Sequence, residues 1–378
     1  MIKEVFITHT NCITPLGFDV ASNIENIVGG VSGIQRHENN MMNKPFYAAI
    51  IDTEMINKAF AKITQGGDYT RLEKMIILAL QPIVEKSNLI LDERVGFILS
   101  TTKGNVTALA NPTVANFEKA QLSQLAKKCS SFFKFKTEPI VVSNACVSGI
   151  LAVSVAKRVI QSNLYDAVFV VAGDEVSQFV LSGFNSFQAM SDLPCKPYSK
   201  NRTGVSLGEA TAAALVSSNR ENAVIKIVGD GTINDANHIS GPSRTGEGLF
   251  LSVKSALKEA NIVADEIDFI SAHGTATPFN DEMEAIALNR LGMEKIPVNS
   301  LKGYYGHTLG ASGLLEMVIG IESVLYNKLY QSLGFDEIGV TESIAVLDKH
   351  TDKECKYFLK TASGFGGCNT AVLFEKVN

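Results

Sequence analysis

Short apolar runs rich in β-branched residues alternate with longer stretches of helical periodicity along this chain. Four apolar runs predict buried strands: VGFILST (95–101), DAVFVVAGDE (166–175), AVIKIVGDGTI (223–233) and EIDFISAH (266–273). Two longer stretches predict helices: RLEKMIILALQPIVEKS (71–87) and GEGLFLSVKSALKEAN (246–261). Regular alternation of strands and helices favours an α/β fold.

The order of elements in the first half of the chain recurs in the second half. A strand, a polar turn and a helix of small residues run through Val142 and again through Val298, an offset of 156 positions. Similar strand motifs lie at Gly208 and Gly366, an offset of 158. Recurrence at nearly one spacing indicates a duplication rather than a short-period solenoid. We therefore predict two α/β halves, residues 1–220 and 221–378, that share one core.

The composition is that of a globular protein with a large core: the 378 residues are 46% hydrophobic and 19% charged. A formal net charge of -5 without any basic block argues against nucleic-acid binding. No apolar run approaches the ~20 residues that cross a bilayer, and the first residues lack a signal-peptide pattern, so no membrane association is expected. Six scattered cysteines without a CxxC pair argue against a zinc site or a disulfide scaffold and favour a reducing cytoplasm.

Cys146 lies in a polar turn between a predicted strand and a predicted helix, in PIVVSNACVSGILAVSVAKRVIQ (139–161). Small residues on this helix, and on the second one that starts near Gly310, would let the two helices approach closely, so we expect both to be internal. A helix N-terminus presents unpaired N–H groups and a partial positive charge, which favour a thiolate. Taken alone, a single core cysteine is more often an inert small hydrophobe.

Other reactive residue types occur where further strands end. His273 ends a predicted strand, Lys302 and His307 lie in a glycine-rich turn, and Phe365 lies in a flexible glycine-rich turn. Loops at strand ends are where α/β enzymes assemble their sites. Separately, His273 could be a core histidine and Lys302 a solvated turn residue. Together with Cys146 they fit nucleophilic catalysis, which needs an opposing base or donor and a pocket for the developing oxyanion.

Six ordered motifs carry a family resemblance: ITPLG (13–17), NACVSG (144–149), KPYSKNRTGVSLGEA (196–210), HGTATPFNDEME (273–284), KGYYGHTLGASGLLE (302–316) and GFGGCNTAVLF (364–374). The chain resembles the β-ketoacyl-acyl-carrier-protein synthases, the condensing enzymes of fatty acid and polyketide synthesis. The resemblance implies a thiolase-like α/β fold with two duplicated halves in a layered αβαβα arrangement. It also implies a decarboxylative Claisen condensation of an acyl thioester with malonyl-acyl-carrier-protein, giving 3-oxoacyl-acyl-carrier-protein.

The resemblance implies a role for each matching residue. Cys146 would accept the acyl group, and His273 and His307 would donate hydrogen bonds to the malonyl thioester oxygen during decarboxylation. Lys302 and Glu284 would form a buried charged pair that supports the histidines. The remaining implied roles are phosphopantetheine binding by Thr275 and Thr277, gating by Phe365, and an oxyanion hole made by the backbone N–H groups of Cys146 and Phe365.

The resemblance also implies what the enzyme works with. Its partner would be acyl carrier protein, whose phosphopantetheine carries the substrates, and the reaction would need no metal and no redox cofactor. A cytoplasmic homodimer is expected, and a heterodimer with another synthase subunit stays open.

Several positions depart from the family pattern. Tyr198 in KPYS replaces a more common phenylalanine, Gln188 stands where a basic carrier-docking residue is frequent, and Ser363 stands where phenylalanine is frequent. These departures leave chain length open, and both fatty acid elongation and a specialised polyene or polyketide pathway fit.

Two other functions stay open. A biosynthetic thiolase would place a second catalytic cysteine in a C-terminal Cys-x-Gly motif, whereas Cys368 is followed by Asn369 and Thr370. A non-condensing subunit that sets chain length usually lacks the nucleophile, which this chain retains. We therefore expect a discrete synthase.

Overall fold

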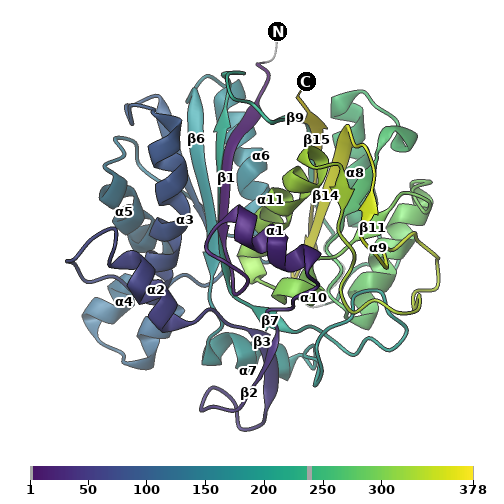
Figure 1. Cartoon of the computed structure of the whole chain (residues 1–378), viewed down its shortest axis with the longest axis horizontal. Helices are drawn as coiled ribbons and strands as arrows, with labels where there is room; N and C mark the ends of the chain where they lie inside the picture. The colour runs from purple at the N-terminus through teal and green to yellow at the C-terminus, as the bar shows by residue number, and fades with distance from the viewer. Residues whose placement is uncertain (1–2, 236–240, 378) are drawn as a thin grey trace.

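A computed structural model describes residues 3–235 and 241–377 of the chain (Figure 1). Within these residues, ten strands form one mixed sheet in the order β11-β10-β14-β15-β9-β1-β8-β6-β4-β5. In chain order these strands are β1 (Phe6–Ile13), β4 (Val95–Ser100), β5 (Ile140–Val142), β6 (Ala167–Asp174), β8 (Ala210–Ser217), β9 (Ile225–Asn234), β10 (Phe269–Ser271), β11 (Val298–Asn299), β14 (Tyr357–Gly364) and β15 (Cys368–Lys376). One small sheet contains β2 (Gln35–His37), β3 (Phe46–Ala49) and β7 (Leu207–Gly208). Another contains β12 (Lys328–Leu329) and β13 (Thr351–Asp352).

Helices cover and separate the two halves of the large sheet. The α-helices of the described ranges are α1 (Val20–Val28), α2 (Thr53–Phe60), α3 (Arg71–Ser87), α4 (Val114–Ala120), α5 (Leu122–Phe133), α6 (Ser148–Gln161), α7 (Gln178–Ser186), α8 (Glu247–Ala260), α9 (Pro278–Arg290), α10 (Lys302–Tyr305) and α11 (Ser312–Leu325). Short 3-10 helices are η1 (Val106–Ala110), η2 (Ala264–Glu266) and η3 (Leu309–Ala311).

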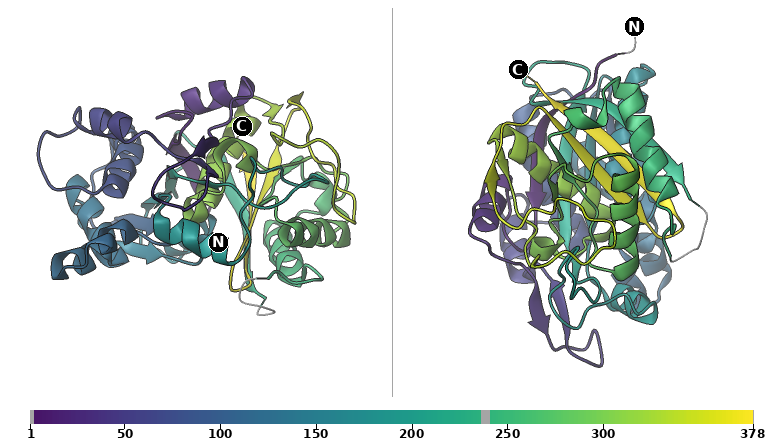
Figure 2. Two further views of the ribbon diagram at one scale, coloured as in Figure 1. Left: turned by 90° about the horizontal axis from the view of Figure 1, so that it is seen from below. Right: turned by 90° about the vertical axis from the view of Figure 1, so that its right-hand side faces the viewer.

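The layers follow the order helix, sheet, helix, sheet, helix. In Figure 1, α3 and α5 lie outside the half that contains β6 and β1, whereas α8 and α9 lie outside the half that contains β14 and β15. Between them, α6 and α11 contact strands of both halves. The left panel of Figure 2 shows the blue N-terminal helices and the green helices of the second half on opposite sides of the molecule. The expected layered αβαβα fold is confirmed.

The two halves of the sheet meet at a narrow joint. β1 pairs with β8 along most of its length but with β9 only at Phe6 and Ile7. Between β8 and β9 the chain crosses from one half to the other. The limits of the two predicted halves, 1–220 and 221–378, stay a prediction.

Local sequence signals explain where the predicted elements lie. The four predicted strands correspond to β4, β6, β9 and β10, and the two predicted helices to α3 and α8. A capping box starts α3: the Thr70 hydroxyl accepts the N–H of Glu73, and the Glu73 carboxylate accepts the N–H of Thr70. Asn88 ends the helix in the left-handed region, with φ of 53°.

The central helices approach as closely as their small residues suggested. A Cβ atom added to Gly149 on α6 would lie 2.6 Å from the backbone oxygen of Gly310, and one added to Gly313 on α11 would lie 2.9 Å from Cβ of Ile150. Both glycines are therefore required by the packing, and α6 and α11 form the middle layer that carries the candidate site. No helix in the described ranges is both long enough and apolar enough to span a membrane.

Candidate active site

Cys146 lies in the turn between β5 and α6, and it is 8% exposed. The preceding residue, Ala145, has a left-handed φ of 45°, so the chain turns sharply before the cysteine. The Ser148 hydroxyl donates to the carbonyl of Ala145 (2.6 Å) and accepts the N–H of Asn144 (2.7 Å). These two bonds fix the turn that presents the thiol at the start of α6.

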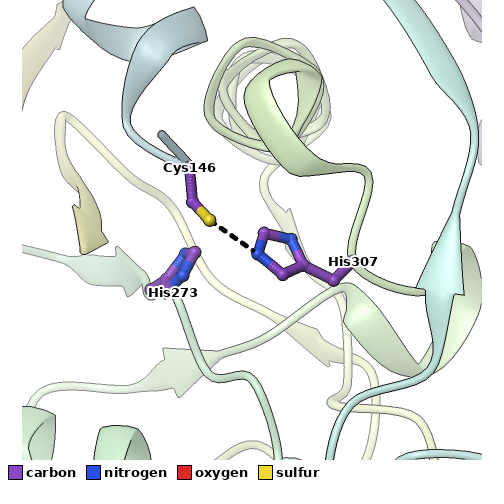
Figure 3. A group of neighbouring side chains, drawn as sticks. All are labelled: Cys146, His273 and His307. Atoms are coloured by element: carbon purple, nitrogen blue, oxygen red, sulfur yellow. Dashed lines mark hydrogen bonds between the residues drawn. The ribbon is translucent and has the colours of Figure 1, made fainter. Parts of the chain in front are cut away.

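His307 lies between α10 and η3 and is buried against Cys146. Its Nε2 is 3.1 Å from Sγ of Cys146 (Figure 3), and its Nδ1 is 2.9 Å from Oγ of Ser312 at the start of α11. The Ser312 hydroxyl is also 3.1 Å from Oγ1 of Thr308. Because hydroxyl groups both donate and accept, Ser312 and Thr308 can support either tautomer of His307.

His273 follows β10 and faces the same thiol. Its ring lies 5.1 Å from the ring of His307, centroid to centroid, at an angle of 83° (Figure 3). Its Nδ1 is 3.4 Å from Nζ of Lys302, which also donates to the backbone oxygen of His273. A lysine ammonium group only donates, so Nδ1 accepts and the ring proton lies on Nε2.

The expected pairing of Lys302 with Glu284 is wrong. Nζ of Lys302 lies 2.7 Å from Oε1 of Glu316 on α11, and Oε2 of Glu316 lies 2.7 Å from Nζ of Lys360 on β14. Glu284 has other partners, because it accepts the N–H groups of His273 (2.8 Å) and Gly274 (2.6 Å). The carboxylate of Glu284 therefore fixes the backbone at His273 without forming an ion pair with Lys302.

Two side chains add donors to Glu284, and one of them departs from the family pattern. The hydroxyl of Tyr198, where phenylalanine is more common, lies 3.0 Å from Oε2, and the side-chain amide of Asn280 lies 2.9 Å from the same oxygen. Hydrogen-bond donors thus satisfy both oxygens of the buried carboxylate, which removes the need for a lysine partner.

The loop after His273 is held by a second carboxylate from α9. Oδ1 of Asp281 accepts the N–H groups of Thr275 (2.9 Å) and Ala276 (3.2 Å). Burial raises the pKa of Asp281 to about 7. The hydroxyls of Thr275 and Thr277 lie 2.8 Å apart, and both residues line the cavity described next. Their expected role in phosphopantetheine binding stays a prediction.

A cavity of about 470 Å³ opens onto the three reactive side chains. Cys146, His273 and His307 line it together with Phe365, and Gln188 and Ser363 also lie in its wall. Phe365 is 36% exposed and contacts two other aromatic rings, Phe184 at 5.7 Å and Phe187 at 5.3 Å between centroids. The cavity therefore extends from the buried thiol of Cys146 to the partly exposed ring of Phe365.

The turn that carries Phe365 lies directly against the turn that carries Cys146. A Cβ atom added to Gly364 would lie 3.0 Å from the backbone nitrogen of Cys146. Gly366 and Gly367 have φ values of 84° and 79°, which side chains rarely adopt. Among the described residues, the N–H groups of Cys146 and Phe365 have no hydrogen-bond acceptor. Two free donors near the thiol are what an oxyanion hole requires.

Burial sets the protonation state of the site. It raises the pKa of Cys146 to about 12, with Cys368 adding to the shift and Lys302 opposing it. The expectation that the helix start favours a thiolate is therefore wrong for the resting site, where the thiol dominates because burial outweighs the field of the helix. Burial, followed by Lys302, lowers the pKa of both His273 and His307 well below 6.5, so both rings are neutral at neutral pH.

The three side chains are also of a type that binds transition metals. The sulfur of Cys146 and ring nitrogens of His273 and His307 all lie within 4.8 Å of one another. Thiolate and imidazole ligands suit zinc. Acyl transfer would use the same sulfur and nitrogen atoms, so metal binding and acyl chemistry would compete here.

The sequence analysis missed three residues of the site. Glu316 ends the quoted motif KGYYGHTLGASGLLE, fourteen positions after Lys302, and an acidic residue in a largely apolar helix is a signal that could have found it. Ser312 lies in the same motif. Lys360 interrupts the apolar strand YFLKTASG, but the sequence gives no indication of which face of the strand it occupies.

Comparisons with known proteins agree with this geometry. Residues 3–222 match the family model described as beta-ketoacyl synthase, N-terminal domain, and residues 224–336 match beta-ketoacyl synthase, C-terminal domain. The chain is 25% identical to 3-oxoacyl-acyl-carrier-protein synthase 2 of Vibrio cholerae over 424 residues, covering 99% of each chain. It is 25% identical to the enzyme of the same name from Staphylococcus aureus over 415 residues, covering 99% of this chain and 98% of the relative.

A solved structure shares the fold. A chain of the complex between the ketosynthase ApeO and its chain length factor ApeC from Xenorhabdus doucetiae superimposes with a TM-score of 0.87 at 23% identity, covering 99% of this chain and 98% of the other.

Proposed function

The chain belongs to the beta-ketoacyl synthase family, which condenses an acyl thioester with malonyl-acyl-carrier-protein, and we propose that Cys146, His273 and His307 carry out this reaction. The observation that supports the assignment most is the contact of 3.1 Å between Nε2 of His307 and Sγ of Cys146, with His273 facing the same thiol in one buried cavity. The remaining contacts explain how these groups divide the two half-reactions.

In the first half-reaction the acyl group moves from carrier protein to Cys146. The N–H groups of Cys146 and Phe365 stabilise the oxyanion as sulfur attacks the thioester carbon. Because the resting cysteine is a thiol, its proton must leave during the attack, and a neutral His307 with a free Nε2 accepts it. The same proton then passes to the departing phosphopantetheine thiolate, so His307 ends neutral. The Ser312 hydroxyl supports the tautomer of His307 that accepts.

In the second half-reaction a malonyl unit replaces the first carrier. The bond between the malonyl carboxylate and C2 breaks, carbon dioxide leaves, and the electron pair forms an enolate. Its oxygen accepts hydrogen bonds from Nε2 of His273 and from Nε2 of His307, once the ring proton of His307 has moved from Nδ1 to Nε2 and Nδ1 accepts from the Ser312 hydroxyl. C2 then attacks the acyl carbon on Cys146. The cysteine leaves as a thiolate and takes one proton from solvent, which completes the cycle.

Partners and setting are inferred from the same chemistry. Acyl carrier protein would present its substrates along Thr275 and Thr277. ApeO was solved with a chain length factor, which supports a synthase subunit as a partner of this chain, and we propose a homodimer as the simplest assembly. We also propose that the enzyme is cytoplasmic and that it needs no metal. It needs no redox cofactor, because condensation transfers no electrons to an acceptor. Fatty acid elongation and a polyketide or polyene pathway both fit.

Cys368 offers the sharpest test of the assignment, because a thiolase would use a second cysteine near the C-terminus. Cys368 is not among the residues that line the cavity, and its sulfur contacts the backbone oxygens of Asn144 and Phe365. Incubation with an acyl carrier should add one acyl mass to the peptide that contains Cys146. Cys368→Ser should retain this label and form 3-oxoacyl product, whereas Cys146→Ala should do neither. Labelled, active Cys146→Ala would refute the proposal.

A further inference from the structure

Lys360 is a buried lysine that the mechanism above does not use. It lies on β14, five positions before Phe365, and it is 0% exposed. Side chains two positions apart on a strand share a face, and the neighbouring Phe358 packs against Gly320 of α11. Lys360 therefore points into the central layer, where an unpaired ammonium group would be strongly unfavourable.

The ammonium group contacts the end of β10 and the residue after it, just before His273. Nζ of Lys360 donates to the backbone oxygens of Ser271 (3.0 Å) and Ala272 (3.1 Å). Nζ of Lys302 donates to the backbone oxygen of His273 itself. The two lysines thus hold three consecutive carbonyl groups, and Lys360 fixes the two that precede the histidine.

Both lysines share a single carboxylate on α11. Each Nζ lies 2.7 Å from a different oxygen of Glu316. The charged or titratable groups around His273 are Lys302 from α10, Glu316 from α11, Glu284 from α9, Lys360 from β14, His307 and Cys146. Burial lowers the pKa of His273 most, and Lys302, His307 and Lys360 lower it further. Lys360 also contributes to the lowered pKa of His307, after burial and Lys302.

We propose that Lys360 is a positioning residue for the histidine pair, because its ammonium group fixes the two backbone carbonyl groups immediately before His273. As a second buried cation beside Lys302, it also disfavours protonation of both rings. This role rests on the proposed function of the histidines. An imidazolium would bind the malonyl carboxylate and stabilise the ground state, whereas a neutral ring donates only to the oxygen on which charge develops. Lys360 therefore favours loss of carbon dioxide over mere binding of malonate.

The test compares Lys360→Met with Lys360→Gln in the full-length protein. Both variants remove the charge. Gln keeps a side-chain N–H donor, on a side chain one atom shorter than that of lysine, and Met keeps no donor. The chain has six histidines, so labelling histidine with carbon-13 allows each ring to be titrated by NMR. In both variants, His273 and His307 should titrate about one pH unit higher, the scale on which a nearby like charge acts. At pH 7.5, malonyl decarboxylation should fall about 10-fold in kcat through misplacement of His273, while acylation of Cys146 changes less than about twofold.

Lys157 supplies the matched control. It is 2% exposed and pairs with Asp230 (2.9 Å) in the second half of α6, away from the cavity, so Lys157→Met removes a buried charge without touching the histidines. It should leave both titrations and the decarboxylation rate unchanged. Unshifted histidines in folded Lys360 variants, or loss of folded protein in both, would overturn the proposal and leave Lys360 a stability residue. A wild-type protein that neither acylates Cys146 nor releases carbon dioxide would instead refute the proposed function.

Discussion

Glu316 holds two buried ammonium groups, so removing different members of this cluster should have unequal effects on stability. Glu316→Gln leaves Lys302 and Lys360, both 0% exposed, without their shared counter-ion. Lys302→Met leaves Glu316 in contact with Lys360 at 2.7 Å. The first change strands two charges, and the second strands none.

The magnitudes follow from this difference. Breaking one buried ion pair by removing a partner costs about 3–5 kcal/mol, because the other charge stays in a medium of low polarity. Glu316→Gln should therefore lower the free energy of unfolding by at least ~5 kcal/mol, which is comparable with the whole stability of many domains. Lys302→Met loses the donor to the backbone oxygen of His273 and should cost only about 1–3 kcal/mol.

Denaturant unfolding of the purified variants measures the effect, provided that the slopes agree with that of the wild type. Lys302→Met/Lys360→Met/Glu316→Leu should recover much of the loss, because no charge remains to be stranded. Turnover should stay low in this triple variant, since His273 loses the lysine contacts that hold its ring and the backbone before it. Equal destabilisation by Glu316→Gln and Lys302→Met, or a larger loss for the latter, would refute the shared-carboxylate account.

Three further predictions concern the packing of α6 against α11, the support of His307 and the thiol of Cys146. Gly149→Ala should lower the free energy of unfolding by about 1–3 kcal/mol, because its Cβ would lie 2.6 Å from a backbone oxygen. Gly183→Ala, whose Cβ would have no atom within 4 Å, should not destabilise the protein, and equal shifts of the melting temperature would contradict the packing argument. Ser312→Ala should slow acylation about 10-fold by freeing Nδ1 of His307, and Ser312→Thr should restore part of the rate; an unchanged acylation rate would show that the hydroxyl is idle. Because the pKa of Cys146 is raised to about 12, its thiolate fraction and its rate of alkylation by iodoacetamide should rise about tenfold per pH unit from 7 to 9, and a plateau below pH 8 would contradict this.

Sequence patterns were sufficient for β4, β6, β9, β10, α3 and α8 and for the three reactive side chains. Apolar runs of strand length located β4 and β6, and helical periodicity located α3, because local propensity and burial agree there. Glycines and serines in two turn-helices indicated that α6 and α11 would pack closely. Cys146, His273 and His307 were predicted from their motifs, and the fold brings them into one cavity.

The charged groups around the histidines could not be assigned in the same way. Glu284 and Glu316 both lie in motifs near Lys302 along the chain, and choosing between them requires knowing that backbone N–H groups already satisfy Glu284. The protonation state of Cys146 depends on the balance between burial, which raises the pKa of the thiol, and the field of the helix start, which lowers it. Burial depends on the tertiary fold and cannot be predicted from the local sequence. Lys360 would be exposed in most strands, and it is buried here only because α11 covers that face of β14.

The most direct test of the account uses His273→Ala and measures both half-reactions on the same protein. After incubation with an acyl carrier, mass spectrometry should find the acyl group on Cys146 at a rate within a few fold of wild type, because His307 and not His273 contacts the thiol. Addition of malonyl-acyl-carrier-protein should then release carbon dioxide about 100-fold more slowly, the scale of losing one oxyanion donor. Equal loss of acylation and decarboxylation would contradict the division of labour proposed for the two histidines.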